Sequence, residues 1–285
     1  ISFAKLLNLC STGLYRNFTQ TVFMRWLLVF FRFVSIATKI GLRQAFFDVY
    51  NRVLRKFGLN VTNRIFYLTS KNAYYPLFAR LDTSDEAVFQ QVFHCDQYSC
   101  LGDISNPKFI IDGGANVGYS SVYFLNKFCD VSIVAVEPDD MSIDICRQNL
   151  KFYGNRAKIV HAGLWSSKTR LIVNKSGQGK EWSTFVKECK TDEKADVYAI
   201  DIYSLLKESG FAHIDILKLD VEGSEAVIFA NHYKDWLNRT KNIVIELHGD
   251  KCEETFFNAM FDYDYELSRS GELTICKNIK PKILM

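Results

Sequence analysis

The sequence contains no CxxC pair and no cysteine–histidine spacing typical of a zinc site, which argues against a zinc-stabilised fold. Its 8 cysteines are scattered. Several of them fall at apolar positions of expected helices and strands, where cysteine packs like a small hydrophobic residue. This usage is typical of a reducing compartment. We therefore expect a cytoplasmic location, with peripheral membrane association as the alternative.

A long uninterrupted apolar run is also missing. The most hydrophobic stretch, residues 21–42, has Trp26–Phe31 as its longest apolar run, whereas a spanning helix needs about 20 apolar residues. Arg25, Arg32 and Lys39 interrupt it, and each cation would cost roughly 2.5–3.5 kcal/mol near a bilayer centre. We therefore expect no membrane span. The seven-residue recurrence of these cations predicts an amphipathic helix, either on an anionic membrane surface or packed on its own domain or a partner subunit.

Acidic residues are scarce at the start of the chain. Residues 1–60 hold nine Lys or Arg and one acid, Asp48, which gives a net charge of +8. Since the whole chain carries +3, residues 61–285 carry −5. This asymmetry predicts a basic amphipathic helical leader over residues 1–60, with an anionic membrane surface as one candidate partner for residues 21–43. The acidic remainder makes nucleic acid an unexpected partner.

The full dinucleotide signature G-x-G-x-x-G is absent as well. In its place Lys108–Ser121 reads KFIIDGGANVGYSS, in which an apolar run ends in Asp112 and is followed by glycines and a helical pattern. Strand, glycine turn and helix form the unit by which an α/β sheet binds a nucleotide-like ligand at its carboxyl edge. Gly113, Gly114 and Gly118 allow the backbone to approach such a ligand closely.

Two classes of nucleotide ligand compete for this turn. Ala115 stands where a dinucleotide site prefers its second glycine, and the Asp112 carboxylate would repel a pyrophosphate but tolerate amino and sulfonium cations. Glu137 lies 19 residues after Gly118, at the distance where an acid accepts hydrogen bonds from ribose hydroxyls. These features favour S-adenosylmethionine over NAD or FAD.

Strand-like and helix-like segments alternate from residue 109 onward. The expected strands are Phe109–Ile111, Val131–Val136, Lys158–His161, Ile214–Leu219 and Ile243–Leu247. The expected helices are Val117–Phe128, Met141–Phe152, Ser224–Phe229 and Glu253–Phe261, and a hairpin of Tyr265–Ser268 and Glu272–Lys277 closes the chain. The alternation predicts an α/β fold whose sheet is mostly parallel, with an antiparallel C-terminal edge hairpin. Residues 164–198 interrupt the pattern as an insertion.

A shorter region precedes this core. Residues 64–81 predict two strands around a turn at Ser70–Asn72. Thr83 and Glu86 then fit a capping box, with Asp85 as a structural acid in the first helical turn. The expected organisation is therefore a leader over 1–60, an N-terminal strand–helix addition over 61–106 and a core over 107–285.

Four motifs carry a family resemblance. IIDGGANVGYSS, AVEPDD, IDILKLDVEGSE and IVIELH resemble the FkbM-type S-adenosylmethionine-dependent methyltransferases, and the likeness covers roughly residues 64–277. It implies a Rossmann-like class I methyltransferase fold and O-methylation of a hydroxyl on a sugar, glycan or natural product. It also implies a set of cofactor contacts from the methionine end to the adenine, namely Asp112, Gly113, Gly114, Asn116, Gly118, Glu137, Gly163 and Leu164.

The residues expected to act on the acceptor follow two later strands. Asp220 and Glu222 come after Ile214–Leu219, and Glu246 and His248 end the next strand, so all four should meet at the carboxyl edge. His248 is suited to be the base by the ordinary pKa of imidazole. The acids could instead raise one another's pKa or share a divalent metal, although we expect no metal. Alternatively, Asp220 or Glu222 caps the following helix.

Two other functions compete with methyl transfer at this stage. One is an NAD-type oxidoreductase, which Ala115 and Asp112 disfavour. The other is a membrane-surface binding module with a vestigial cofactor site, which would bind vesicles through residues 21–43 and would have no affinity for the cofactor. Intact acids at positions 112, 137 and 220 argue against loss of the site. The sequence thus favours an enzyme.

Overall fold

The chain divides into two compact units, Ile1–Asn60 and Val61–Met285. The computed structural model describes residues 27–31, 33–35, 37, 38, 42, 46, 49, 50, 53, 65–81, 83–176, 183–190 and 192–283. Arg25, Arg32 and Lys39, from which the amphipathic leader was predicted, lie outside these residues. Within the described parts of the chain, no helix is both long and apolar enough to cross a bilayer.

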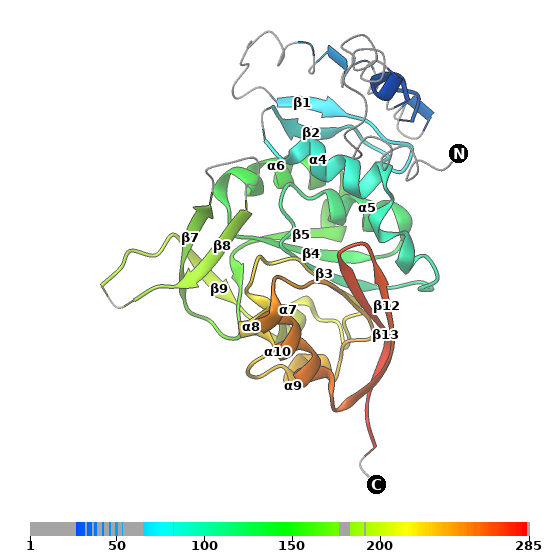
Figure 1. The fold of residues 1–285 in the computed structure, drawn as a ribbon. Coiled ribbons are helices and arrows are strands. Elements are labelled where there is room, and N and C mark those ends of the chain that lie inside the picture. The colour runs from blue at the N-terminus through cyan, green and yellow to red at the C-terminus, as the bar shows by residue number, and fades with distance from the viewer. Residues whose placement is uncertain are drawn as a thin grey trace, which may run out of the picture. The chain divides into compact units, whose positions relative to one another are not determined.

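A seven-stranded sheet forms the centre of the second unit, in the order β12-β13-β11-β10-β3-β4-β5 (Figure 1). The neighbours from β5 to β11 pair in parallel, whereas β13 is antiparallel to both β11 and β12. The strands are β3 (Phe109–Gly113), β4 (Ser132–Glu137), β5 (Ala157–His161), β10 (Ile216–Leu219), β11 (Ile243–Glu246), β12 (Tyr263–Ser270) and β13 (Leu273–Pro281). The predicted mostly parallel α/β sheet with an antiparallel C-terminal hairpin is confirmed.

The chain order reverses at β3, because β4 follows on one side of it and β10 lies on the other. In open α/β sheets, ligands bind outside the carboxyl ends of the strands at such a switch point. All five residues of β3 are buried, as are all four of β10, which suits central parallel strands covered on both faces. The fold thus directs attention to the ends of these two strands.

Helices cover both faces of the sheet (Figure 1). One face carries α4 (Asp85–Phe89), α5 (Tyr119–Lys127) and α6 (Asp140–Leu150), and the other carries α7 (Ile202–Ser209), α8 (Glu225–Ile228), α9 (Lys234–Leu237) and α10 (Asp250–Met260). Asp139 caps α6 by accepting a hydrogen bond from the Ser142 N–H. The sequence analysis did not predict α7, although Asp201 caps its start and Gly210 follows it in a left-handed conformation.

The N-terminal addition is fastened to the core. Its strands β1 (Ile65–Leu68) and β2 (Leu77–Arg80) pair antiparallel, as predicted, and α4 continues into a π-helical turn over Gln90–His94 and a 3-10 turn over Gln97–Leu101. The Tyr119 hydroxyl donates to the Phe78 carbonyl at 2.8 Å. The Asn149 amide oxygen accepts from the Phe78 N–H at 2.6 Å. Both bonds are buried, so β2 is held against the first residues of α5 and the last of α6.

The predicted capping box is wrong. The N-cap residue of α4 is Ser84, which makes no side-chain capping bond. The Thr83 hydroxyl accepts a hydrogen bond from the Asp85 N–H, only two residues further on. Asp85 is fully buried and accepts from the Arg80 backbone N–H and, through both oxygens, from its guanidinium at 2.8–3.0 Å. The acid therefore fixes Arg80 rather than the helix end, because a guanidinium and a carboxylate match as a two-bond pair.

Residues 163–200 build a second, four-stranded sheet in the order β6-β9-β7-β8. Its strands are β6 (Gly163–Leu164), β7 (Arg170–Ser176), β8 (Ser183–Glu188) and β9 (Val197–Ile200). Buried Trp165, Leu171, Val197 and Ala199 form its own small hydrophobic cluster. The segment predicted as an insertion is thus a separate sheet, which Figure 1 shows beside the carboxyl ends of β4 and β5.

A buried ion pair joins the two central strands. Lys218 on β10 and Asp112 on β3 are register partners, and Lys218 Nζ lies 3.1 Å from Asp112 Oδ1. The side chains are only 3% and 0% exposed. The hydroxyls of Ser120 and Ser121 both donate to the other carboxylate oxygen at 2.6 Å. Lys218 therefore reaches a carboxylate within the core, and each charge has a compensating partner.

We predict that Lys218→Met destabilises the fold by roughly 3–5 kcal/mol, because it leaves the Asp112 charge buried without its cation. Urea unfolding followed by circular dichroism measures the change. Lys108→Met is the matched control, since Lys108 and Asp130 form an exposed pair, and such pairs contribute about 0–1 kcal/mol. Equal unfolding midpoints for the two variants would contradict this account of the pair.

Candidate active site

The backbone of the turn after β3 lies directly against the backbone at the end of β10. Gly114 has a φ of +72°, and a Cβ at this position would lie 1.7 Å from the carbonyl oxygen of Asp220. Only glycine meets both demands. The other two predicted glycines serve packing, because a Cβ on Gly113 would lie 2.3 Å from Leu164 Cδ1 and one on Gly118 would lie 3.0 Å from Cys146 Sγ. The turn therefore joins two strand ends in addition to facing a ligand.

Glu137 ends β4 beside this turn. It is 6% exposed, and its two oxygens accept hydrogen bonds from the backbone N–H groups of Asn116 at 2.8 Å and Asp139 at 2.9 Å. Burial raises the pKa of Glu137 to about 7, although the two N–H donors oppose the shift. The carboxylate is thus held in one orientation, with oxygen lone pairs left for a ligand.

A cavity of about 390 Å³ lies at the carboxyl ends of β3, β4 and β10. It is lined by the predicted cofactor residues Gly114, Asn116, Glu137, Gly163 and Leu164. This volume falls within the range of about 300–1,000 Å³ that is usual for small-molecule sites. The structure thus brings together residues from three segments that the sequence separates by up to 50 positions.

Three of the predicted cofactor residues do not line this cavity. Asp112 lies behind the turn, where it pairs with Lys218, and Gly113 and Gly118 pack against core side chains. Since the charge of Asp112 is compensated by Lys218 inside the protein, Asp112 would not repel a pyrophosphate from the site. These residues support the cavity wall, and the cation Lys218 does so directly by donating to the carbonyls of Gly113 and Gly114 at 3.2 and 2.8 Å.

The N-terminal addition supplies a wall that the sequence analysis missed. Arg80, Thr83 and Ser84 also line the cavity. The Arg80 guanidinium is fixed by Asp85 and lies 3.3 Å from the Ser142 hydroxyl at the start of α6. Although burial opposes the charged form, the hydrogen bond and charge of Asp85 raise the pKa of Arg80. A permanent cation therefore lies at the cavity. Its only signal in the sequence is the short spacing of Arg80 and Asp85.

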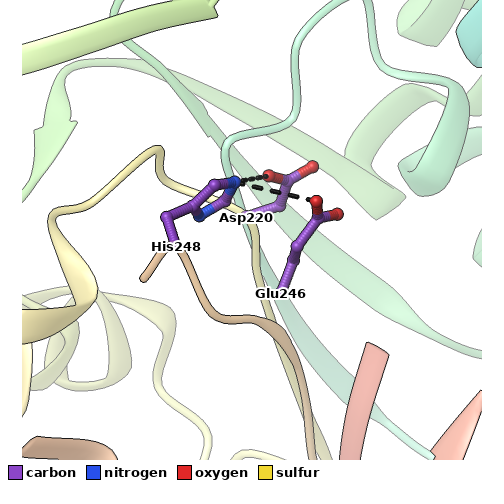
Figure 2. A group of neighbouring side chains, drawn as sticks. All are labelled: Asp220, Glu246 and His248. Carbon is purple, nitrogen blue, oxygen red and sulfur yellow. Dashed lines mark ion pairs between the residues drawn. The ribbon is translucent and has the colours of Figure 1, made fainter. Parts of the chain in front are cut away.

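The residues expected to act on the acceptor do meet. Figure 2 shows His248 facing the carboxylates of Asp220 and Glu246, with Nε2 3.8 Å from Asp220 Oδ1 and 3.7 Å from Glu246 Oε1. Glu222, in a left-handed conformation, brings Oε2 to 3.6 Å from the same nitrogen. These separations are ionic contacts longer than hydrogen bonds. Asp220 and Glu222 also line the cavity, so the cluster adjoins the cofactor space.

Glu225 is a member of this cluster that the sequence analysis did not single out. It is fully buried, and its Oε1 lies 2.9 Å from His248 Nδ1. Its carboxylate also accepts hydrogen bonds from the N–H groups of Val221 and Gly223. Glu225 therefore provides the acceptors for these backbone donors in the loop between β10 and α8. The alternative that Asp220 or Glu222 caps α8 is therefore wrong. An acid five residues after Asp220 resembles an ordinary first-turn acid in sequence, which explains the omission.

The charges of the cluster differ from the sequence expectation. The hydrogen bond to Glu225 raises the pKa of His248 to about 9 against the opposing effect of burial, so imidazolium dominates at neutral pH. Burial and the charge of Asp220 raise the pKa of Glu246 to about 7. Because a general base works best when its pKa is near the working pH, Glu246 fits that role better than His248. The prediction that His248 keeps an ordinary pKa is wrong.

The same side chains could hold a cation. Asp220, Glu246 and His248 each offer one ligand atom, and these atoms lie within 4.8 Å of one another. The bond from Glu225 to Nδ1 leaves Nε2 directed at the two acids, which is how a carboxylate orients a metal-binding imidazole. A metal would have to displace the proton from His248. The expectation of no metal stays a prediction.

Residues 112–269 match the Methyltransferase FkbM domain. The chain belongs to this family. The matched region begins at Asp112 and includes the glycine turn, Glu137, the four-stranded sheet and the Asp220–His248 cluster. Membership confirms the resemblance in the four motifs, the class I methyltransferase fold and S-adenosylmethionine as the cofactor. It also decides against the NAD-type oxidoreductase.

Two relatives and one solved structure are similar to parts of this chain. The chain is 29% identical over 192 residues to methyltransferase sdnD of Sordaria araneosa, a match that covers 56% of this chain and 73% of the relative. It is 23% identical over 186 residues to methyltransferase 1 of Beauveria bassiana, covering 58% and 74%. Among solved structures, methyltransferase FkbM of Methylobacillus flagellatus aligns with a TM-score of 0.45 at 14% identity, covering 68% of this chain. The chain spans about half, 53%, of that FkbM methyltransferase.

We predict that Glu137→Ala weakens binding of S-adenosylhomocysteine about 10- to 100-fold, the range expected for lost hydrogen bonds to a charged group. Isothermal calorimetry measures the affinity. Glu137→Gln, which retains an acceptor for the turn, separates loss of ligand contacts from collapse of the turn. Asp140→Ala is the control, because that neighbouring side chain is 89% exposed. Wild-type affinity in Glu137→Ala would refute the ribose assignment.

We also predict a pH dependence of stability from His248. Its folded pKa is raised to about 9, so the stabilisation is complete below the unfolded value of 6.5 and is lost as the pH rises through about 9. Between these two pH values, the free energy of unfolding of the wild type should fall by up to about 3 kcal/mol relative to that of His248→Asn. Urea unfolding at several pH values measures this difference. His213→Asn, which removes an exposed imidazole, should follow the wild-type curve; parallel curves for wild type and His248→Asn would contradict the prediction.

Proposed function

We propose that this FkbM-family methyltransferase transfers the methyl group of S-adenosylmethionine to a hydroxyl of a sugar, glycan or natural product. The observation that carries the proposal is the contact cluster of Asp220, Glu246 and His248 beside the cofactor cavity. A hydroxyl is a poor nucleophile until its proton is removed, and the cluster offers a proton acceptor at that place. A small-molecule acceptor is consistent with a cavity of this size.

The proposed reaction is an in-line displacement. The acceptor oxygen forms a bond to the methyl carbon while the carbon–sulfur bond breaks, and its electrons return to sulfur as the cation becomes the neutral thioether of S-adenosylhomocysteine. The acceptor proton passes to a carboxylate. The methyl group is already activated by its bond to the cationic sulfur. The chain's main task is therefore to align oxygen, carbon and sulfur.

Glu246 is the base we propose. It is 22% exposed at the end of β11, and its pKa of about 7 lets it exist as a carboxylate and still gain a proton. The His248 imidazolium, 3.7 Å away and anchored by Glu225, would stabilise the developing negative charge on the acceptor oxygen. Asp220 and Glu222 on the cavity wall would accept hydrogen bonds from the acceptor's other hydroxyls.

A divalent cation is the second candidate for activating the hydroxyl. The positions of Asp220, Glu246 and His248 support it, because oxygen and imidazole ligands together suit Mn²⁺ or Zn²⁺. A bound cation would lower the pKa of the acceptor hydroxyl directly, which would make a protein base less important. The two routes use the same three side chains but differ in their response to a chelator.

We propose a cytoplasmic location for this reaction. All seven described cysteines are free, and three of them, Cys146, Cys252 and Cys276, are buried. Free thiols persist in a reducing compartment, whereas an oxidising one favours their pairing. Measurement of free thiols in protein prepared without reductant from its own cells tests the location.

The function is tested by transfer of labelled methyl from S-adenosylmethionine to sugars and polyketide-like hydroxyl compounds, each paired with its deoxy analogue. Product should form only with the hydroxyl compound. Methylation of amine acceptors instead would refute O-methylation. The acceptor found in this way then serves for kinetics.

We predict that Glu246→Gln lowers kcat about 10²- to 10⁴-fold, the usual contribution of a general base, without changing cofactor affinity. In the wild type, kcat should rise as the pH passes about 7, because the Glu246 carboxyl must be ionised. Glu253→Gln is the control, since Glu253 pairs with Arg269 on the surface. Loss of activity with EDTA and recovery with Mn²⁺ would favour the metal route over the base route.

A further inference from the structure

The first unit presents apolar side chains that methyl transfer does not use. Every residue that the structure describes between positions 27 and 53 is α-helical. The rings of Phe33 and Phe46 meet edge to face at 5.1 Å. In one continuous helix, residues 13 apart would be separated by about 20 Å, so the chain must turn between them. The unit thus contains two helical stretches that pack on each other.

Large apolar side chains on both stretches remain exposed. Seven of them are 39–64% exposed, namely Phe30, Phe31, Val34, Leu42, Phe46, Tyr50 and Val53. At 100° per residue, the last four fall within an arc of about 80°, and the first three within about 100°. Each stretch therefore carries an exposed apolar stripe, and Phe46 belongs to the second stripe although its ring also meets Phe33. Exposed apolar stripes of this kind mark interaction surfaces.

The charge of the same unit identifies the partner. Residues 1–60 carry +8, with nine cations and one acid. A protein groove that receives apolar stripes does not require such a charge, whereas an anionic bilayer satisfies both features. Its acyl boundary accepts the apolar stripes and its headgroups attract the cations, each worth about 1 kcal/mol near the surface. No described helix could span the membrane, so the attachment would be interfacial.

We infer that residues 27–53 form an interfacial anchor that binds this protein to the surface of an anionic lipid bilayer through the exposed stripes of its two helical stretches. The anchor is independent of the methyl-transfer site. It extends beyond residues 21–43, because Phe46, Tyr50 and Val53 continue the exposed stripe. The catalytic unit, at −5, contributes no electrostatic attraction to such a surface.

Vesicle sedimentation with the full chain tests the anchor. The probes are vesicles of phosphatidylcholine with and without phosphatidylserine. We expect binding to the anionic vesicles, weak binding to the neutral ones, and release as salt is raised. Leu42→Asp and Tyr50→Asp should each weaken binding about tenfold or more, because each removes a large apolar side chain from the interface and adds repulsion. Arg43→Gln combined with Arg52→Gln should weaken binding to anionic vesicles only.

Phe261→Asp is the matched control, since Phe261 is a 75% exposed apolar side chain in the catalytic unit and should not affect vesicle binding. Calorimetry with S-adenosylhomocysteine and helix content by circular dichroism verify that each variant is folded. No binding to anionic vesicles, or equal loss with Phe261→Asp, would overturn the inference. Self-association in sedimentation velocity that Leu42→Asp abolishes, without vesicle binding, would identify a second copy as the partner instead. Failure of methyl transfer affects none of these readouts.

Discussion

The buried ion pair of Asp112 and Lys218 is the constraint on which the active site depends. Lys218 Nζ reaches the Asp112 carboxylate, the carbonyls of Gly113 and Gly114, and, at 4.0 Å, the carboxylate of Asp220. One cation thus fixes the end of β3, the turn that faces the cofactor and the first acid of the acceptor side. Because an unpaired charge cannot remain at this depth, the pair also ensures that the two strand ends form together or not at all.

The two halves of the site are in direct backbone contact. The carbonyl of Gly113 accepts hydrogen bonds from the Asp220 N–H and from Lys218. The Asp220 carbonyl lies so close to Gly114 that no side chain would fit there. On one side of this seam, Glu137 is oriented by two N–H groups. On the other, Glu225 orients His248. Glu137 and His248 are therefore both held by hydrogen bonds within the protein, which is how a site keeps reacting atoms aligned without the ligand's help.

Sequence alone was sufficient where the signal is local. The strand Phe109–Ile111, the glycine turn and the acid Glu137 follow from apolar runs, glycine spacing and distance along the chain. The roles of Asp85 and Glu225 do not follow from such local signals, because an acid that pairs across the fold has the same local appearance as one that caps a helix. The charge of His248 was missed for a related reason: its raised pKa comes from Glu225, 23 residues away. Arg80 was missed because the loop geometry that turns it to the cavity has no fixed spacing.

The open edge of the central sheet has a consequence for how these molecules meet one another. Its outermost strand, β12, offers unpaired backbone groups along its free side, but Asp264, Glu266 and Arg269 stand exposed on it and the register shifts between Asp264 and Glu266. A strand from another molecule could pair here only by stripping water from these charges and matching an irregular backbone. At high concentration, these features therefore protect the protein from edge-to-edge aggregation through β12.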